Sequence, residues 1–75
     1  MRRYFFDIRI GDQIGEDDEG QLLPDLEAVQ EETLRTLADV AKELPEFPPE
    51  LAVQVRDDDG SVMRVKVIFE IDRTN

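Results

Sequence analysis

The chain has 75 residues with no cysteine and no histidine, and its nineteen acidic residues outnumber nine basic ones, giving a net charge of -10. This length makes one small domain, and the missing cysteines exclude disulfides and thiolate metal sites, which favours a cytoplasmic protein over a secreted one. No apolar run approaches the roughly 18 residues of a membrane span, and the acid excess disfavours nucleic acid, whose phosphates would be repelled.

The chain opens with a predicted strand over residues 3–10, where side chains that favour the core alternate with side chains that favour solvent. This opening therefore reads as a strand and not as a signal peptide. Gly11-Asp12 predicts a tight turn, and a short return strand is expected near Gln13–Glu16. An acidic loop (residues 16–20) follows, and Gln21–Leu23 adds a further short extended piece.

An amphipathic helix is predicted over residues 25–44. Asp25 can accept a hydrogen bond from a free backbone N–H of the first turn, which favours a helix start there. One side of the helix carries residues at spacings of three and four, namely Leu26, Val29, Thr33, Leu37, Val40 and Leu44. Pro45 disfavours helical geometry at Leu44 and ends the helix.

Two further strands are predicted over residues 51–56 and 63–71, joined by the turn Asp57–Gly60, and residues 72–75 are expected to fray. The order β-β-α-β-β predicts a single α+β domain over residues 1–75. Its three- to four-stranded antiparallel sheet should carry the helix packed on one face. The expected core residues are Phe6, Ile8, Leu37, Val40, Val53, Val65, Val67 and Phe69.

Three stretches, RRYFFDIR, EDDEG and LPDLEA, together resemble a family of small bacterial domains of unknown function, common in rhizobia and related proteobacteria. The resemblance covers residues 2–44 and, more loosely, the closing hairpin, whereas the proline-rich link over residues 45–49 departs from it. It implies a cytoplasmic bacterial protein and supplies no catalytic residue. Gly20, Pro24 and Asp25, the fixed points of the pattern, all have structural explanations.

The acidic residues suggest no chemistry of their own. The run from Asp12 to Glu19 lacks the ordered oxygen ligands of a calcium site, so we interpret it as a solvated loop, and Asp57–Gly60 as a turn. The one serine, Ser61, has no histidine to activate it, and no glycine-rich phosphate loop is present. The sequence therefore predicts no enzyme, no metal and no cofactor.

Basic side chains share one face of the predicted sheet, where they should point outward. The candidate binding residues are Arg3, Phe5, Arg9, Arg56, Arg64, Lys66 and Ile68. Asp7 and Glu70 are the acids predicted on the same face. Such a face either binds an anionic partner or is an ordinary strand surface with cross-strand ion pairs.

Two functions remain open at this stage. One is a small non-catalytic protein-interaction or regulatory module that uses its open sheet face or a sheet edge. We expect it to form a homodimer, because one helix leaves the other face and the strand edges uncovered; another protein is an alternative partner. The other function is a nucleic-acid-associated protein, which would stack RNA bases on Phe5 or present its acidic helix as a phosphate-backbone mimic.

Overall fold

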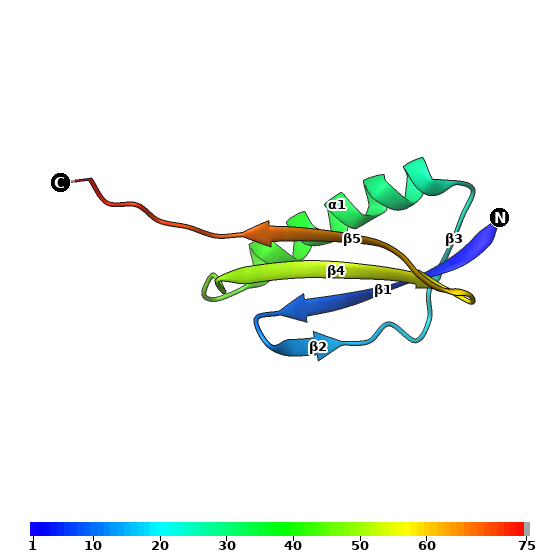
Figure 1. Cartoon of the computed structure of the whole chain (residues 1–75), viewed down its shortest axis with the longest axis horizontal. Helices are drawn as coiled ribbons and strands as arrows, with labels where there is room; N and C mark the ends of the chain where they lie inside the picture. Colours follow the sequence, from blue (N-terminus) through cyan, green and yellow to red (C-terminus); the bar gives the residue numbers. More distant parts are fainter. Residues whose placement is uncertain (75) are drawn as a thin grey trace.

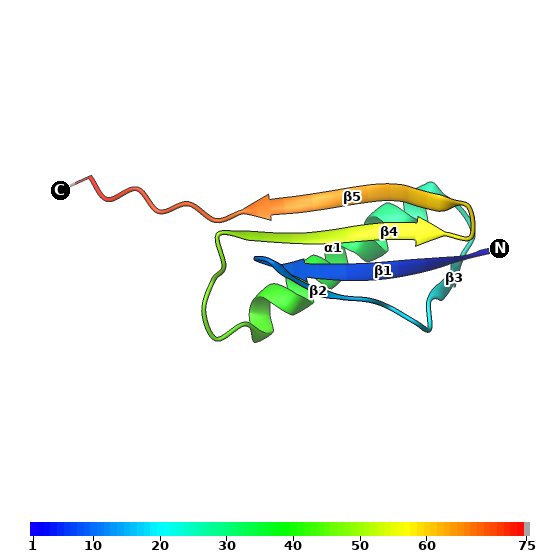
Figure 2. The ribbon, with the colours of Figure 1, turned by 60° about the horizontal axis from the view of Figure 1, so that its bottom comes forward.

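The computed structural model describes residues 1–74. Its elements are β1 (Arg2–Ile10), β2 (Gln13–Gly15), β3 (Gln21–Leu23), α1 (Leu26–Glu43), β4 (Glu50–Asp57) and β5 (Gly60–Ile68). The strands form one antiparallel sheet in the order β2-β1-β4-β5, and β3 also pairs with β1. The helix lies across one face of this sheet (Figures 1 and 2), which confirms the predicted α+β fold, with β3 as an additional short strand.

The two edges of β1 are used differently. One edge pairs with β4 over six residues, from Phe5 opposite Arg56 to Ile10 opposite Leu51. The other edge is shared, because β2 pairs with residues 8–10 and β3 pairs with residues 2–4. The acidic loop therefore has to cross the gap that these two short strands leave beside the middle of β1.

The core lies between α1 and the two central strands. Its buried residues are Tyr4, Phe6, Val29, Leu37, Leu51, Val53 and Val55. Of the predicted core residues, Ile8, Val40, Val65, Val67 and Phe69 are only partly buried at its border. For Val65, Val67 and Phe69 the physical reason is the strand order, because β4 lies in the centre of the sheet and β5, which Phe69 follows, lies at its rim. Sequence periodicity identifies the inward face of each strand but does not identify the central strand.

The helix begins and ends where the sequence predicts. The Asp25 carboxylate accepts a hydrogen bond of 2.8 Å from the Ala28 N–H, and the backbone at Leu44 is extended ahead of Pro45. Thr33 is buried in the core-facing stripe, where its hydroxyl donates to the Val29 carbonyl oxygen over 2.7 Å. This bond satisfies a polar group that burial would otherwise make costly. Within residues 1–74, no helix has the length and apolar content to cross a membrane.

The chain continues past β5 without a neighbouring strand. The Phe69 N–H still donates to the Pro49 carbonyl oxygen over 3.1 Å, and the Phe69 ring lies 5.1 Å from that of Phe47. Beyond this contact the chain runs away from the domain as an isolated extended segment (residues 70–74; Figure 1), and Ile71 is 88% exposed. Asn75, the last residue expected to fray, lies outside the described residues.

A pair of identical substitutions on α1 tests where the core lies. Leu37 is 4% exposed and Leu34 is 51% exposed. Leu37→Ala is expected to lower the free energy of unfolding by about 2–5 kcal/mol through lost burial and the cavity left behind. Urea unfolding followed by circular dichroism measures it. Leu34→Ala is the matched control; a loss at Leu37 no larger than about 0.5 kcal/mol, typical of surface sites, contradicts the assigned core.

Candidate functional site

The sheet face opposite α1, here called the open sheet face, collects the predicted binding residues. Side chains alternate along a strand, so the residues between the buried positions of β1, β4 and β5 project from this face. The strand register places Phe5 beside Arg56, and Arg9 and Lys66 on either side of Ala52. Arg3, Arg64 and Ile68 follow the same alternation on β1 and β5. The structure therefore brings the candidate set onto one surface.

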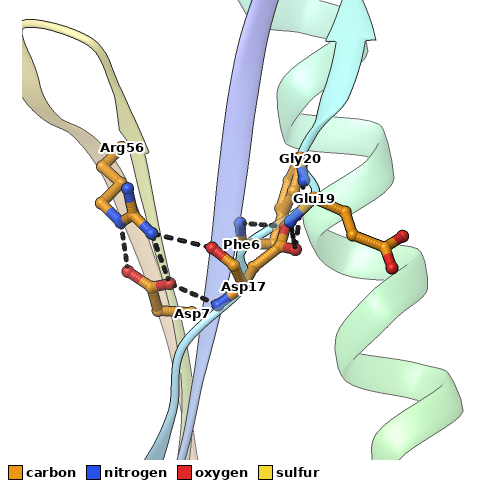
Figure 3. A network of polar contacts seen from close by, with 6 residues as sticks. All are labelled: Phe6, Asp7, Asp17, Glu19, Gly20 and Arg56. Atoms are coloured by element: carbon orange, nitrogen blue, oxygen red, sulfur yellow. Dashed lines mark hydrogen bonds and ion pairs between the residues drawn. The ribbon is translucent and has the colours of Figure 1, made fainter.

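Arg56 is held in a network within the fold and is not free for a partner (Figure 3). Its Nε donates to Asp7 Oδ2 over 2.9 Å, and a terminal nitrogen donates to the Asp17 carbonyl oxygen over 2.8 Å. The hydrogen bond to Asp7 raises the pKa of Arg56, against a smaller lowering by desolvation. The guanidinium carbon also lies 4.6 Å from the centre of the Phe5 ring, within cation–π range. Arg56 therefore lies on the open sheet face, as predicted, with its guanidinium group engaged by Asp7 and Asp17.

The Asp17 carboxylate fills the gap between β2 and β3 at the edge of β1. Its Oδ2 accepts from the Phe6 N–H over 3.0 Å, and its Oδ1 accepts from the N–H groups of Glu19 and Gly20. The Asp17 N–H in turn donates to Asp7 Oδ1 over 2.9 Å. In Figure 3 the Glu19 carboxylate points away from this network. Our interpretation of the acidic run as a merely solvated loop is therefore wrong at Asp17.

The hydrogen bonds to Asp17 also set its protonation. Desolvation raises the pKa of Asp17, but the backbone N–H groups of Phe6, Gly20 and Glu19, helped by the charge of Arg56, outweigh it. The pKa of Asp17 is consequently held below its ordinary value. The carboxylate form is the one that the fold selects, because only that form accepts from all three donors with both oxygens.

Gly20 allows the acidic loop to pass close to the Arg3 and Phe5 side chains of the open sheet face. Its φ of +72° is in the left-handed region that favours glycine. A Cβ at this position would also come within 2.9 Å of the Phe5 ring and of the Arg3 Cγ. The Arg3 guanidinium continues over the loop and donates to the Glu19 carbonyl oxygen over 2.8 Å. Arg3 and Phe5 therefore help to hold the loop.

The second acidic segment is a turn, as predicted. Asp57 accepts from the Asp59 N–H over 2.8 Å and pairs with Arg2 at 3.1 Å, and Gly60 has a φ of +129°. The hydrogen bond from Asp59 and the pair with Arg2 lower the pKa of Asp57, against desolvation. Among residues 1–74, no group of three or more carboxylates is arranged to hold a metal ion.

A hollow of about 210 Å³ opens on the remaining part of the open sheet face. It is lined by Asp7, Arg9, Ile14, Glu16, Ala52, Gln54 and Arg64. Ala52 is buried by its longer neighbours, so a short side chain forms the floor. In the part of the chain that the structure describes, Arg9 and Arg64 have no ion-pair partner, whereas Lys66 lies 3.9 Å from Glu50. The hollow thus offers two available guanidinium groups.

An exposed apolar side chain lines the hollow beside these guanidinium groups. It is Ile14 of β2, which is 61% exposed, whereas Ile68 of β5, 63% exposed, lies opposite Glu50 and outside the lining. The prediction omitted Ile14, because the local sequence does not fix how the three-residue strand β2 pairs. It also omitted Ala52, because the local sequence does not show that this small residue lies between long side chains of neighbouring strands. Arginine beside exposed apolar side chains is typical of a surface that binds another molecule. Two guanidinium groups placed in this way can donate hydrogen bonds to a carboxylate or phosphate group.

These features define a small α+β domain with one covered and one open sheet face. The chain belongs to the family described as Domain of unknown function (DUF6894), whose model matches residues 3–68. The match confirms a family of unknown function and extends through the closing hairpin, beyond the part that resembled the family well. No curated protein and no solved structure matches the chain.

The acid sensitivity of the fold tests the role of Asp17. Because its pKa is lowered in the folded state, Asp17 stabilises the fold above its ordinary pKa of about 3.9, and this contribution is lost as the pH falls through the lower folded value. Asp17→Asn should therefore unfold at a lower urea concentration at pH 7, and the difference from wild type should shrink below about pH 4.

The neighbouring acid supplies the control for this measurement. Asp18→Asn removes the same charge from an exposed position in the same loop, so its midpoint should stay close to that of wild type throughout. A difference between Asp17→Asn and wild type that is equal at pH 3 and pH 7 contradicts the proposed ionisation of Asp17.

Proposed function

We propose that this protein is a small, non-catalytic interaction module of the bacterial cytoplasm. Its open sheet face binds an acidic segment of another protein. The observation that carries this proposal is the hollow between Arg9 and Arg64, where neither guanidinium group has an ion-pair partner within residues 1–74. The other basic groups on this face already have contacts within the chain.

The shape and chemistry of the hollow suit a carboxylate. A guanidinium group binds a carboxylate through two parallel N–H donors, and the buried Ala52 leaves space above the sheet between the two arginines. Ile14, which lines the hollow, supplies exposed apolar surface beside the two arginines. An extended segment that carries an acidic side chain next to an apolar one fits this arrangement.

Two sources of negative charge oppose this binding: the net charge of the chain, and the Glu16 carboxylate in the lining of the hollow, whereas Asp7, the other acid of the lining, is paired with Arg56. At physiological ionic strength the Debye length is about 8 Å, so most of the -10 net charge is screened from an approaching segment. Arg9 and Arg64 act at contact distance, where screening is weak. We therefore expect binding that is specific but slow to form, because electrostatic steering does not assist it.

The nucleic-acid alternative receives less support. Base stacking on a sheet needs an accessible aromatic ring. Arg56 covers the Phe5 ring, whose edge also lies where a side chain on Gly20 would be. Phe5 therefore offers little surface to a base, and the interaction module is the function that we favour.

Two substitutions in the hollow test the proposal without altering β5. Arg9→Glu reverses one charge, and Ala52→Glu fills the floor with a competing carboxylate. Used as baits in an affinity capture from the native cell, both variants should lose a protein that the wild-type chain retains. Lys42→Glu is the matched control, because it makes the same charge reversal on the exposed side of α1 and should retain that protein.

The folded state of each bait is checked by circular dichroism and urea unfolding before the capture. If the wild-type protein and both hollow variants retain the same partners, the hollow is not the binding site. If the retained material is RNA, which ribonuclease treatment removes, the nucleic-acid function replaces the one proposed here.

A further inference from the structure

The outer edge of β5 is an unpaired strand edge. Residues of an antiparallel strand direct their backbone N–H and C=O groups alternately to the two sides. The Phe69 N–H points to Pro49 on the β4 side, and Glu50, which pairs with Ile68, directs its carbonyl oxygen to Gly11 on the opposite side. The backbone groups of Ile68 therefore point off the edge, and so do those of the residues two and four positions earlier, Lys66 and Arg64.

The extended segment continues this alternation with opposite charges. Glu70 and Asp72 follow Ile68 at the same two-residue spacing as Lys66 and Arg64 precede it. The five side chains thus read basic, basic, apolar, acidic, acidic along one side of a single extended strand. Such a pattern is self-complementary when a second copy runs antiparallel, since each basic position then meets an acidic one.

We propose that two copies of the chain pair antiparallel along β5 and the extended segment, with the two-fold axis at Ile68. Ile68 then lies opposite its own counterpart. Lys66 meets Glu70 of the second copy and Arg64 meets Asp72 of the second copy, and symmetry repeats each pair. The two sheets join into one continuous sheet, with both helices on the same side.

The neighbouring symmetric registers fit less well. An axis at Lys66 places two lysines opposite each other, and like charges in that position are destabilising. An axis at Val67 places Lys66 opposite Ile68 and leaves Asp72 without a basic partner. The register centred on Ile68 is the one of the three that pairs all four charged positions.

The other side of the same strand supports the pairing of two copies. Residues 65, 67, 69 and 71 alternate with the charged positions and are all apolar: Val65, Val67, Phe69 and Ile71. In the proposed register Val67 meets Phe69 of the second copy, and Val65 meets Ile71 of the second copy. Ile71, which is 88% exposed in the single chain, would be covered by this contact. Burial of the apolar groups supplies a driving force that ion pairs alone lack.

The dimer does not depend on what the open sheet face binds. Arg9 and Ala52 lie on β1 and β4, away from the paired edges. Arg64 lies both at the hollow and on the paired strand β5. Its guanidinium group has five N–H donors, enough for Asp72 of the second copy and a ligand carboxylate. The variants that test the hollow therefore leave the dimer contacts unchanged, and failure of one proposal leaves the other standing.

Charge reversal and exchange test the register, with mass measured by sedimentation equilibrium over a wide concentration range. The wild-type chain should reach twice its 8.7 kDa mass. Lys66→Glu and Glu70→Lys each create two like-charge contacts, so each should raise the dimer Kd roughly tenfold or more. The double variant Lys66→Glu/Glu70→Lys exchanges the two charges and should restore the wild-type Kd. This rescue would show that the single variants lost dimerisation because of charge repulsion and not because of misfolding.

Lys42→Glu, on the exposed side of α1, is the control and should dimerise as wild type does. A wild-type chain that stays at 8.7 kDa at every concentration overturns the proposal. So does a dimer that both single reversals leave intact, because its interface must then lie elsewhere. Single reversals that dissociate the dimer without rescue by the double variant overturn the register centred on Ile68.

Discussion

The Asp17 carboxylate is the contact on which the arrangement of the acidic loop depends. The middle of β1 has no strand beside it between β2 and β3, and the Phe6 N–H in this gap needs an acceptor. Asp17 supplies one and at the same time shapes the turn at Glu19 and Gly20. Its own backbone then meets Asp7 and Arg56, so the loop, β1 and β4 are tied through one residue.

The strands, the helix and the inward face of each could be predicted from the sequence, but the contacts made by individual acidic side chains could not. Alternation in the strands and the Asp25 cap identified a sheet with one covering helix, because both signals are local. Local sequence does not show which of the four consecutive acids binds the Phe6 N–H. That role belongs to Asp17 because β2 and β3 pair with the same edge of β1 and leave a gap where the acidic loop crosses. The spacing from Asp17 to Gly20 was the available signal, because an aspartate that accepts from N–H groups two and three residues later is a common turn.

Most of the basic side chains on the open sheet face make contacts within the chain that explain their position there. Arg56 is engaged with Asp7 and Asp17, Arg3 crosses the loop, and Lys66 lies near Glu50. Cross-strand pairing, one of the two readings left open for this face, therefore accounts for much of the pattern. It does not account for Arg9 and Arg64, and these two side chains border the same hollow.

The unequal edges of the sheet limit how far it can grow. On one side, β2 has three residues and the acidic loop then closes over the middle of β1, so a further strand finds only a short ladder there. On the other side, β5 presents nine residues. Fibril formation by edge-to-edge addition requires two receptive edges on every chain. This domain has one, so the pairing that we propose for β5 ends at a closed pair and does not propagate into a polymer.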